Sequence, residues 1–215
     1  MTQDTRANWI SRSRPWIGAL ALVVVTAAVT TTVVSDEKAQ EPKMSPEEQK
    51  MMDAWMKAAT PGEHHQKLAG LVGTWEARTK FWMDPTQPAE EGTGTAKWKS
   101  MYGNRYFMLE WDGKSQKMGP FQGLSISGYD NVAKKYVDVW IDSMSTGFMI
   151  SWGTPDATGK VITYLGEMHD PMTGQLKKSR SILRLVSDTE MTFEMFDKGP
   201  DGKEYRNMEI VYRKK

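Results

Sequence analysis

The 215-residue sequence contains no cysteine. This absence excludes disulfides, thiolate metal sites, a cysteine nucleophile and the attachment cysteine of a bacterial lipoprotein. No basic block is present either, because 28 Lys and Arg are balanced by 27 Asp and Glu. The sequence therefore does not predict a nucleic-acid-binding protein. Three histidines and scattered carboxylates do not form a zinc motif, so we expect no metal site and no cofactor.

Tryptophan and methionine are abundant, with nine and 16 residues respectively. Tryptophan supplies a large buried area, and methionine fills irregular gaps between other side chains. The length is enough for one well-buried domain with appendages. Composition thus predicts a single domain with an adaptable apolar interior.

Residues 16–34 carry no charge and follow an N-terminal stretch that contains Arg6, Arg12 and Arg14. Their length is near the lower limit for crossing a bilayer, and the positive-inside rule places residues 1–15 in the cytoplasm. Residues 1–35 are therefore expected to be a signal anchor or a removable signal peptide. An anchor predicts a single-pass cell-membrane protein with the following domain outside the cytoplasm. Cleavage would instead give a periplasmic or secreted protein.

Residues 36–61 are expected to form a polar linker and an amphipathic helix. Ser45 is a helix N-cap, Pro46 suits the first turn, and Glu48 completes a capping box. An apolar face that we expect to pack against the following domain is formed by Met51, Met52, Trp55, Met56 and Ala59. A second short helical segment follows at residues 63–71, and its His64 and His65 are expected on the surface.

From Gly73 onward the pattern is typical of β-structure. Trp75, Ala77, Thr79 and Phe81 alternate with charged residues, which predicts a strand with one buried face. Nine turn signals divide the remaining chain into ten short strands. Hairpin-length connections imply antiparallel neighbours, and closure into an up-and-down barrel removes exposed edges. Residues 62–215 are thus predicted to be an all-β, about ten-stranded antiparallel barrel, with a two-sheet sandwich as the alternative.

Four separated segments resemble a bacterial family of unknown function, domain family 1579. They are HQKLAGLVGTWE at 65–76, GYDNVAKKYVDVWIDSMSTG at 128–147, DPMTG at 170–174 and FEMFDKGPDGKEYRNMEIVYRK at 193–214. The resemblance covers roughly residues 62–215. That family is similar to the calycin superfamily, which includes lipocalins and fatty-acid-binding proteins. The resemblance implies a barrel-closing contact between Trp75 and Arg213, with the guanidinium stacked on the indole.

Barrels of this size enclose space for one small ligand. The candidate cavity wall consists of Phe81, Trp98, Met108, Trp140, Phe148, Trp152, Tyr164 and Phe193. Arg180 and Arg184 lie four apart on one strand and so share a face. Facing inward they would bind a carboxylate head group, and facing outward they would be solvated surface charges.

No catalytic constellation is evident, and the sequence favours a binding protein over an enzyme. The hypothesis is an exported barrel that holds a small apolar or lipid-like ligand, with the membrane contacted through residues 16–34. An enzyme that uses interior carboxylates such as Asp138, Asp142 or Glu110 is one alternative. A structural or interaction barrel with a filled core is the other.

Overall fold

The computed structural model describes residues 44–117, 119–171, 173–199 and 201–215. The apolar segment at residues 16–34 lies outside the described residues, so the signal and anchor interpretations stay predictions. Within the described ranges, no helix is long and apolar enough to cross a membrane. Residues 44–215 form one compact unit.

Two helices precede ten strands in this unit. The elements are α1 Pro46–Ala59, α2 Glu63–Ala69, β1 Gly73–Phe81, β2 Glu90–Met101, β3 Tyr106–Ser115, β4 Gly119–Asp130, β5 Lys135–Asp142, β6 Met149–Pro155, β7 Val161–His169, β8 Leu176–Ser187, β9 Glu190–Lys198 and β10 Glu204–Lys214.

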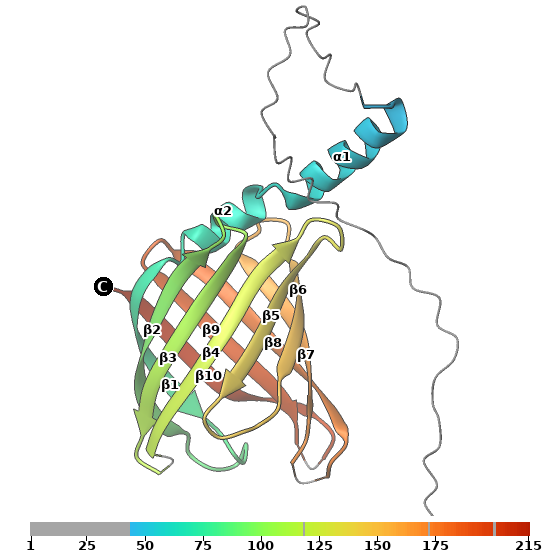
Figure 1. Cartoon of the computed structure of the whole chain (residues 1–215). Coiled ribbons are helices and arrows are strands. Elements are labelled where there is room, and N and C mark those ends of the chain that lie inside the picture. The colour runs from blue at the N-terminus through green and yellow to red at the C-terminus, as the bar shows by residue number, and fades with distance from the viewer. Residues whose placement is uncertain (1–43, 118, 172, 200) are drawn as a thin grey trace, which may run out of the picture. The chain divides into compact units, whose positions relative to one another are not determined.

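The strands close into one antiparallel barrel in which each strand pairs with its neighbours in sequence (Figure 1). The ring is completed by β10, which pairs with β1 from Trp75 opposite Lys214 to Phe81 opposite Met208. The predicted up-and-down barrel is therefore confirmed, and the sandwich alternative is wrong. Closure leaves no unpaired sheet edge, which is the physical advantage of this arrangement.

Short turns set the antiparallel order. In the β2–β3 hairpin, Gly103 and Asn104 both have a φ of 64°. This left-handed conformation is open to glycine and tolerated by asparagine, so the Tyr102-Gly103-Asn104 turn signal has a steric basis.

The barrel interior contains the hydrophobic core. In β1, Trp75 and Ala77 are buried while Glu76 and Arg78 are exposed, as the alternation predicted. The largest fully buried side chains come from strands all around the ring, namely Trp75, Phe107, Tyr136, Ile162 and Met191.

Helix α1 begins with the predicted capping box. The hydroxyl of Ser45 accepts a hydrogen bond from the Glu48 N–H, and Glu48 accepts one from the Ser45 N–H. However, α1 buries no residue, so the expectation that its apolar face packs on the barrel is wrong. Its C-terminal carbonyls are instead held by two turn residues, because Asn131 and Arg105 donate hydrogen bonds to them.

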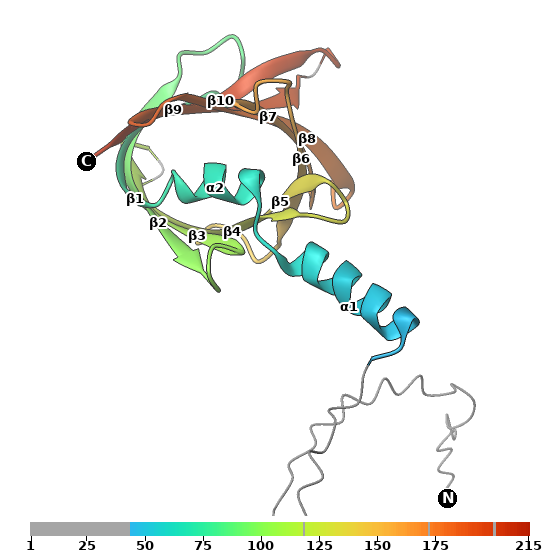
Figure 2. The ribbon, with the colours of Figure 1, turned by 90° about the horizontal axis from the view of Figure 1, so that it is seen from above.

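Helix α2 lies across one end of the barrel (Figure 2). Leu68 is buried within the core that continues into the barrel, and so is Leu71 just after the helix. His65 is also buried, which corrects the prediction that it lies on the surface; its Nδ1 accepts a hydrogen bond from the Gly62 N–H. His64 is partly buried and stacks on Tyr129, with ring centroids 4.0 Å apart. The two histidines thus fix α2 to the barrel end where β4 ends and β5 begins.

Candidate functional site

Strand β5 places an unexpected set of side chains in the barrel. Tyr136, Asp138, Trp140 and Asp142 face inward, whereas the branched residues between them face outward. Tyr136 lies at the end that α2 covers, where His64 Nδ1 is 3.0 Å from its hydroxyl. Asp138 and Trp140 follow at increasing depth from α2. The more polar of the two faces of β5 therefore lines the interior.

Asp138 accepts hydrogen bonds from two serines of β4. Ser127 is its direct register partner, and the Ser127 hydroxyl donates to Oδ2 over 2.6 Å. The hydroxyl of Ser125, one inward position along β4, donates to the same oxygen. On the other side of β5, the buried Ser151 of β6 is the register partner of Asp138. The carboxyl group is thus set among small hydroxyl side chains rather than among apolar ones.

The electrostatic setting of Asp138 is unusual for a carboxyl group. Burial raises its pKa, and the hydrogen bonds from Ser125 and Ser127 lower it only in part. In the described part of the chain, none of the ion pairs formed by lysine or arginine includes Asp138. A carboxyl inside a barrel without a cationic partner is costly, and such groups concentrate at functional sites.

Two buried tyrosines face the same interior region. Tyr164 comes from β7 and Tyr212 from β10, and both are buried. Burial is the main cause that raises the pKa of each phenol, and the charge of Asp138 raises it further. Because both phenols keep their protons, each can donate a hydrogen bond into the interior.

The barrel end opposite α2 has an apolar lining. Phe81, Phe121, Trp140 and Met208 face inward there and remain partly exposed. Phe121 stacks on Trp140 with centroids 6.3 Å apart, and the indole N–H donates to Asp142 Oδ2 over 3.0 Å. A Cβ at Gly123 would lie 2.3 Å from the Trp140 ring, so the indole rests directly against the β4 backbone. Apart from Asp142, the inward side chains named at this end are therefore apolar and partly accessible.

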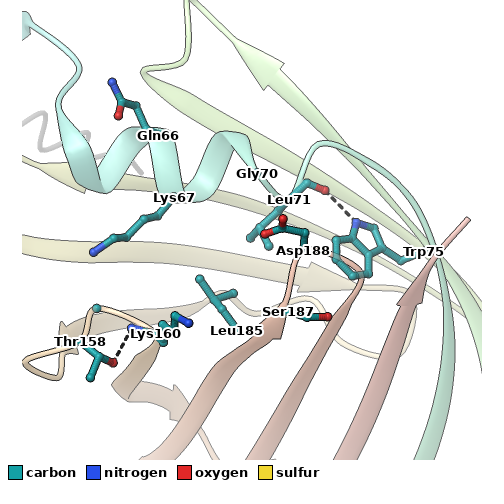
Figure 3. A pocket seen from close by; sticks show the side chains of 11 residues that line it. Gln66, Lys67, Gly70, Leu71, Trp75, Thr158, Lys160, Leu185, Ser187 and Asp188 are labelled. Atoms are coloured by element: carbon teal, nitrogen blue, oxygen red, sulfur yellow. Dashed lines mark hydrogen bonds between the residues drawn. The ribbon is translucent and has the colours of Figure 1, made fainter.

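A separate pocket of about 300 Å³ lies between α2 and the barrel rim (Figure 3). Leu71, Trp75 and Leu185 supply its apolar part, and Lys67 and Lys160 are among its polar residues. The other lining residues are Gln66, Gly70, Thr158, Gly159, Ser187 and Asp188.

Five of the predicted wall residues do face inward. They are Phe81, Trp98, Trp140, Tyr164 and Phe193. Whether they contact a ligand stays a prediction.

Three predicted wall residues are wrong. Met108 and Trp152 occupy alternate positions that point to the outer face, because the neighbouring Phe107 and Ser151 are buried inside. Phe148 precedes β6 and is 66% exposed. Aromatic or apolar character alone did not distinguish the two faces of these strands.

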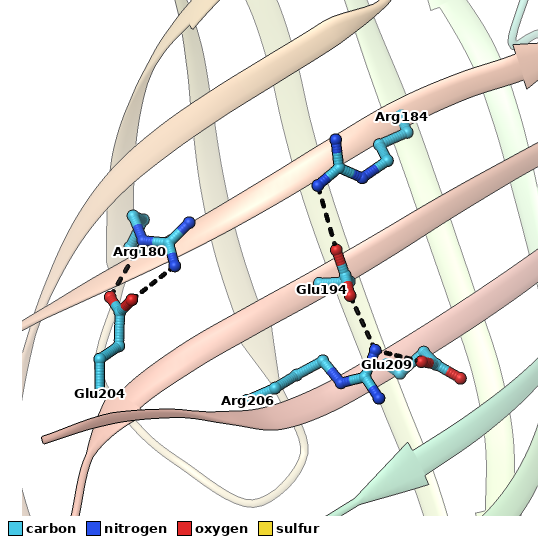
Figure 4. Close-up of polar contacts among 6 residues, drawn as sticks. All are labelled: Arg180, Arg184, Glu194, Glu204, Arg206 and Glu209. Atoms are coloured by element: carbon cyan, nitrogen blue, oxygen red, sulfur yellow. Dashed lines mark hydrogen bonds and ion pairs between the residues drawn. The ribbon is translucent and has the colours of Figure 1, made fainter.

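Arg180 and Arg184 point outward, so the inward carboxylate-binding alternative is wrong. Figure 4 shows a pair of Arg180 with Glu204 and, separate from it, a charged network that contains Arg184. Arg180 donates two hydrogen bonds to Glu204, and Arg184 pairs with Glu194 at 3.4 Å. Arg206 joins the same network through Glu194. Their acidic partners explain these arginines without a ligand.

The expected contact between Trp75 and Arg213 is also wrong. The register puts Lys214 opposite Trp75, and Lys214 Nζ lies 5.3 Å from the indole centroid. Arg213 is opposite Glu76 on the outer face, where it approaches Glu190 at 3.7 Å. The barrel end is still closed by a cation over an indole, but the cation is one residue further along β10.

Sequence reasoning named Asp138 and Asp142 as interior carboxylates but missed the serines and Tyr212. The pattern Ser125-Ile126-Ser127 contained a usable signal, because two serines at strand spacing share a face. Glu110, the third carboxylate considered, faces outward and pairs with Lys99 at 2.7 Å. Among the described residues, no group of three or more histidine and acidic side chains could hold a metal ion.

Comparison with known proteins agrees with this fold. The family described as "Protein of unknown function (DUF1579)" matches residues 60–214, whereas no curated protein matches the sequence. The crystal structure of Rv2717c from M. tuberculosis is similar, with a TM-score of 0.55 and 15% identity over 73% of this chain and 99% of that chain. The S-type phycobiliprotein lyase CPES from Guillardia theta has a TM-score of 0.51 and 9% identity, covering 75% of this chain and 96% of that chain. At these identities the shared feature is the fold alone.

Proposed function

The chain belongs to the DUF1579 family of proteins of unknown function, and from that premise we propose that its barrel binds a small molecule with an apolar body and one hydrogen-bonding group. The observation that carries this proposal is the position of Asp138. It faces the interior and is held by two serine hydroxyls. Binding sites of this kind combine a mostly apolar wall with a few placed polar groups.

The apolar body would occupy the accessible end of the barrel. Phe81, Phe121, Trp140 and Met208 line that end and stay partly exposed. Covering them would remove apolar surface from water, which contributes roughly 25 cal/mol for each Å² buried. The filled-core alternative does not account for inward-facing aromatic side chains that remain exposed.

The polar group of the ligand would be a hydroxyl or an amine. Asp138 accepts hydrogen bonds, and a protonated amine would supply the cationic partner that this carboxyl group lacks. A carboxylate ligand would be repelled by an ionised Asp138. Tyr164 and Tyr212 could donate to the oxygen of an alcohol in the same region.

Catalysis is less well supported than binding by the same residues. Acid–base enzymes need one group poised to accept a proton and another poised to donate one. The pKa of Asp138, Tyr164 and Tyr212 all move upward, so burial disfavours the charged form of each of the three groups. This common direction suits hydrogen bonding to a ligand.

The proposed setting is outside the cytoplasm. The uncharged segment at residues 16–34, with Arg12 and Arg14 before it and Asp36 after it, supports export and a single membrane anchor. Protease accessibility of the barrel in intact cells tests this part separately from ligand binding.

Three water-soluble probes with one common body test the ligand class. 2-Naphthylmethylamine and 2-naphthylmethanol carry the expected groups, and 2-naphthoate carries the disfavoured one. Calorimetry with the full chain should show that the amine and the alcohol bind at least ten-fold more tightly than the carboxylate. Asp138→Asn should weaken amine binding about ten-fold, which corresponds to about 1.4 kcal/mol.

Asp112→Asn is the matched control, because Asp112 is exposed on the outer face of β3. It should leave the affinity for all three probes unchanged. Preferred binding of 2-naphthoate, or equal binding of the amine to the wild type and to Asp138→Asn, would contradict the proposed role of Asp138. A failure of all three probes to bind would contradict the container function itself.

A further inference from the structure

The outer face of the barrel carries an apolar patch over β4, β5, β6 and β7. Its exposed members are between 38 and 66% accessible and are Ile126, Ile141, Phe148, Ile150, Trp152 and Leu165. We call these six residues the outer patch. The solvent-exposed face of a β-sheet is normally polar, and exposed apolar patches mark interaction sites.

The strand register joins four members of the outer patch, Ile126, Ile150, Trp152 and Leu165, into two neighbouring rows. Ile126, Val139 and Ile150 form one row across three strands. Val137, Trp152 and Leu165 form the next row. Neighbouring strands are about 4.8 Å apart, so side chains within a row touch or nearly touch one another.

Helix α1 presents a second apolar surface that no side chain in the described part of the chain buries. Met51, Met52, Trp55 and Met56 lie on one face and are between 47 and 70% exposed. An isolated helix of this length is marginal in water, since most helical stability comes from packing of the apolar face. We therefore expect the apolar face of α1 to pack against another surface.

The barrel of the same chain does not provide that surface. Asn131 donates hydrogen bonds of 3.0 and 2.8 Å to the carbonyls of Ala58 and Thr60, and Arg105 donates one of 3.0 Å to Ala59. These bonds fix the C-terminal end of α1, and the helix extends outward from the barrel (Figure 1). Docking of α1 on its own outer patch would require these bonds to break.

We propose that two copies of this chain pair, with α1 of each copy lying on the outer patch of the other. Fourteen helical residues span about 21 Å, whereas four strands span about 14 Å between the outermost strand axes, so the helix can cross the whole patch. The two surfaces together expose on the order of 1,000 Å² per copy, comparable with the ~800 Å² that each partner buries in a standard interface. Such an exchange is isologous and closes as a dimer.

The absence of cysteine in the chain allows a direct cross-linking test. Full-length Met56→Cys with one tag and full-length Leu165→Cys with another are expressed together and treated with a short bismaleimide. The tagged heterodimer should form at least five-fold more than with Thr93→Cys as the second partner, because Thr93 is exposed on the outer face of β2, away from the outer patch. A second pair, Met52→Cys with Ile150→Cys, should behave in the same way.

Substitution of the patch gives the reverse test. Adding Trp152→Ser to the Leu165→Cys copy should reduce the amount of cross-linked heterodimer at least three-fold. Because Trp152 is exposed, the substituted barrel should keep its resistance to trypsin. Equal cross-linking of Leu165→Cys and Thr93→Cys would overturn the proposal. So would an intramolecular link in the Met56→Cys/Leu165→Cys double variant without any heterodimer, which would show docking within one copy. Absence of every cross-link, with the patch covered by lipid or another protein instead, would also overturn it.

Discussion

The indole N–H of Trp75 donates a hydrogen bond of 2.7 Å to the carbonyl oxygen of Leu71. This bond connects the start of β1 to the segment that follows α2, and both side chains are buried. The closed end of the barrel therefore depends on a polar contact as well as on packing.

Trp75→Phe should destabilise the protein. The ring remains apolar, but the Leu71 carbonyl loses its buried donor and the smaller ring leaves space, so we expect a loss of about 1–3 kcal/mol. Urea unfolding followed by circular dichroism measures this change. Tyr102→Phe, at an exposed aromatic side chain outside the outer patch, should change the free energy of unfolding by less than about 0.5 kcal/mol. Equal effects of the two variants would contradict the role given to the Trp75 N–H.

Asp138→Asn should stabilise the protein at neutral pH while it weakens ligand binding. Burial raises the pKa of Asp138 above its ordinary value of 3.8. The contribution of Asp138 to the free energy of unfolding is therefore most favourable below pH 3.8, and it is lost as the pH rises through the folded pKa. The amide cannot ionise, and we expect a gain of roughly 1–3 kcal/mol above that pKa. Unfolding curves between pH 4 and pH 8 test this, and a variant that is less stable than the wild type at pH 8 would contradict it.

The docking of α2 should weaken in mild acid. Burial is the main cause that lowers the pKa of both His64 and His65 below the ordinary 6.5. The stabilising contribution is therefore complete above pH 6.5 and is lost as the pH falls below it toward the folded pKa. Hydrogen exchange of α2 amides at pH 7.5 and pH 5.5, corrected for intrinsic rates, should show the loss. His64→Gln combined with His65→Gln should remove most of this pH dependence.

Gly123→Ala should disturb the apolar end of the interior. A Cβ at this position would lie 2.3 Å from the Trp140 ring, so the indole must move, at a cost of about 1–3 kcal/mol. Gly147→Ala is the control because a Cβ there meets nothing within 4 Å. Unfolding curves and near-ultraviolet circular dichroism should separate the two variants, and identical behaviour would mean that the ring is free to shift.

Arg180→Gln should have little effect on stability and none on the interior. Arg180 and Glu204 form a bidentate pair on the outer face, and exposed ion pairs contribute about 0.2–1 kcal/mol that salt screens. The variant should unfold close to the wild type, with the difference shrinking in 0.5 M NaCl. A changed affinity for the naphthyl probes would contradict the outward placement.

The number and order of strands could be predicted because both depend on local signals. Turn residues such as Gly103 and Asn104 fix the hairpins, and alternation in β1 fixes the buried face. The inward face of β5 could not be predicted in this way. Val137 and Val139 look more suited to a core than Asp138 does, but Ser125, Ser127 and Ser151 on neighbouring strands make the polar face the inner one.

Register also limited the prediction of the site. Trp75 lies at the closed end of the barrel, as expected, yet the cation that contacts its indole belongs to Lys214 and not to Arg213. A shift of one residue exchanges the inner and outer faces of a strand, and nothing in the local sequence of β10 fixes that shift. The prediction for Met108 and Trp152 is wrong because apolar character was taken to indicate an inward side chain. Both residues lie on the outer face of their strands.

The pairing of β1 with β10 has a consequence for biosynthesis. β1 can meet β2 as soon as the first hairpin emerges from the ribosome, but its other edge has no partner until residues 204–214 of β10 are available. Until then the growing sheet exposes an edge at each side to any chain nearby. Removal of residues 204–214 would therefore leave β1 and β9 each with an open edge that can pair with another chain.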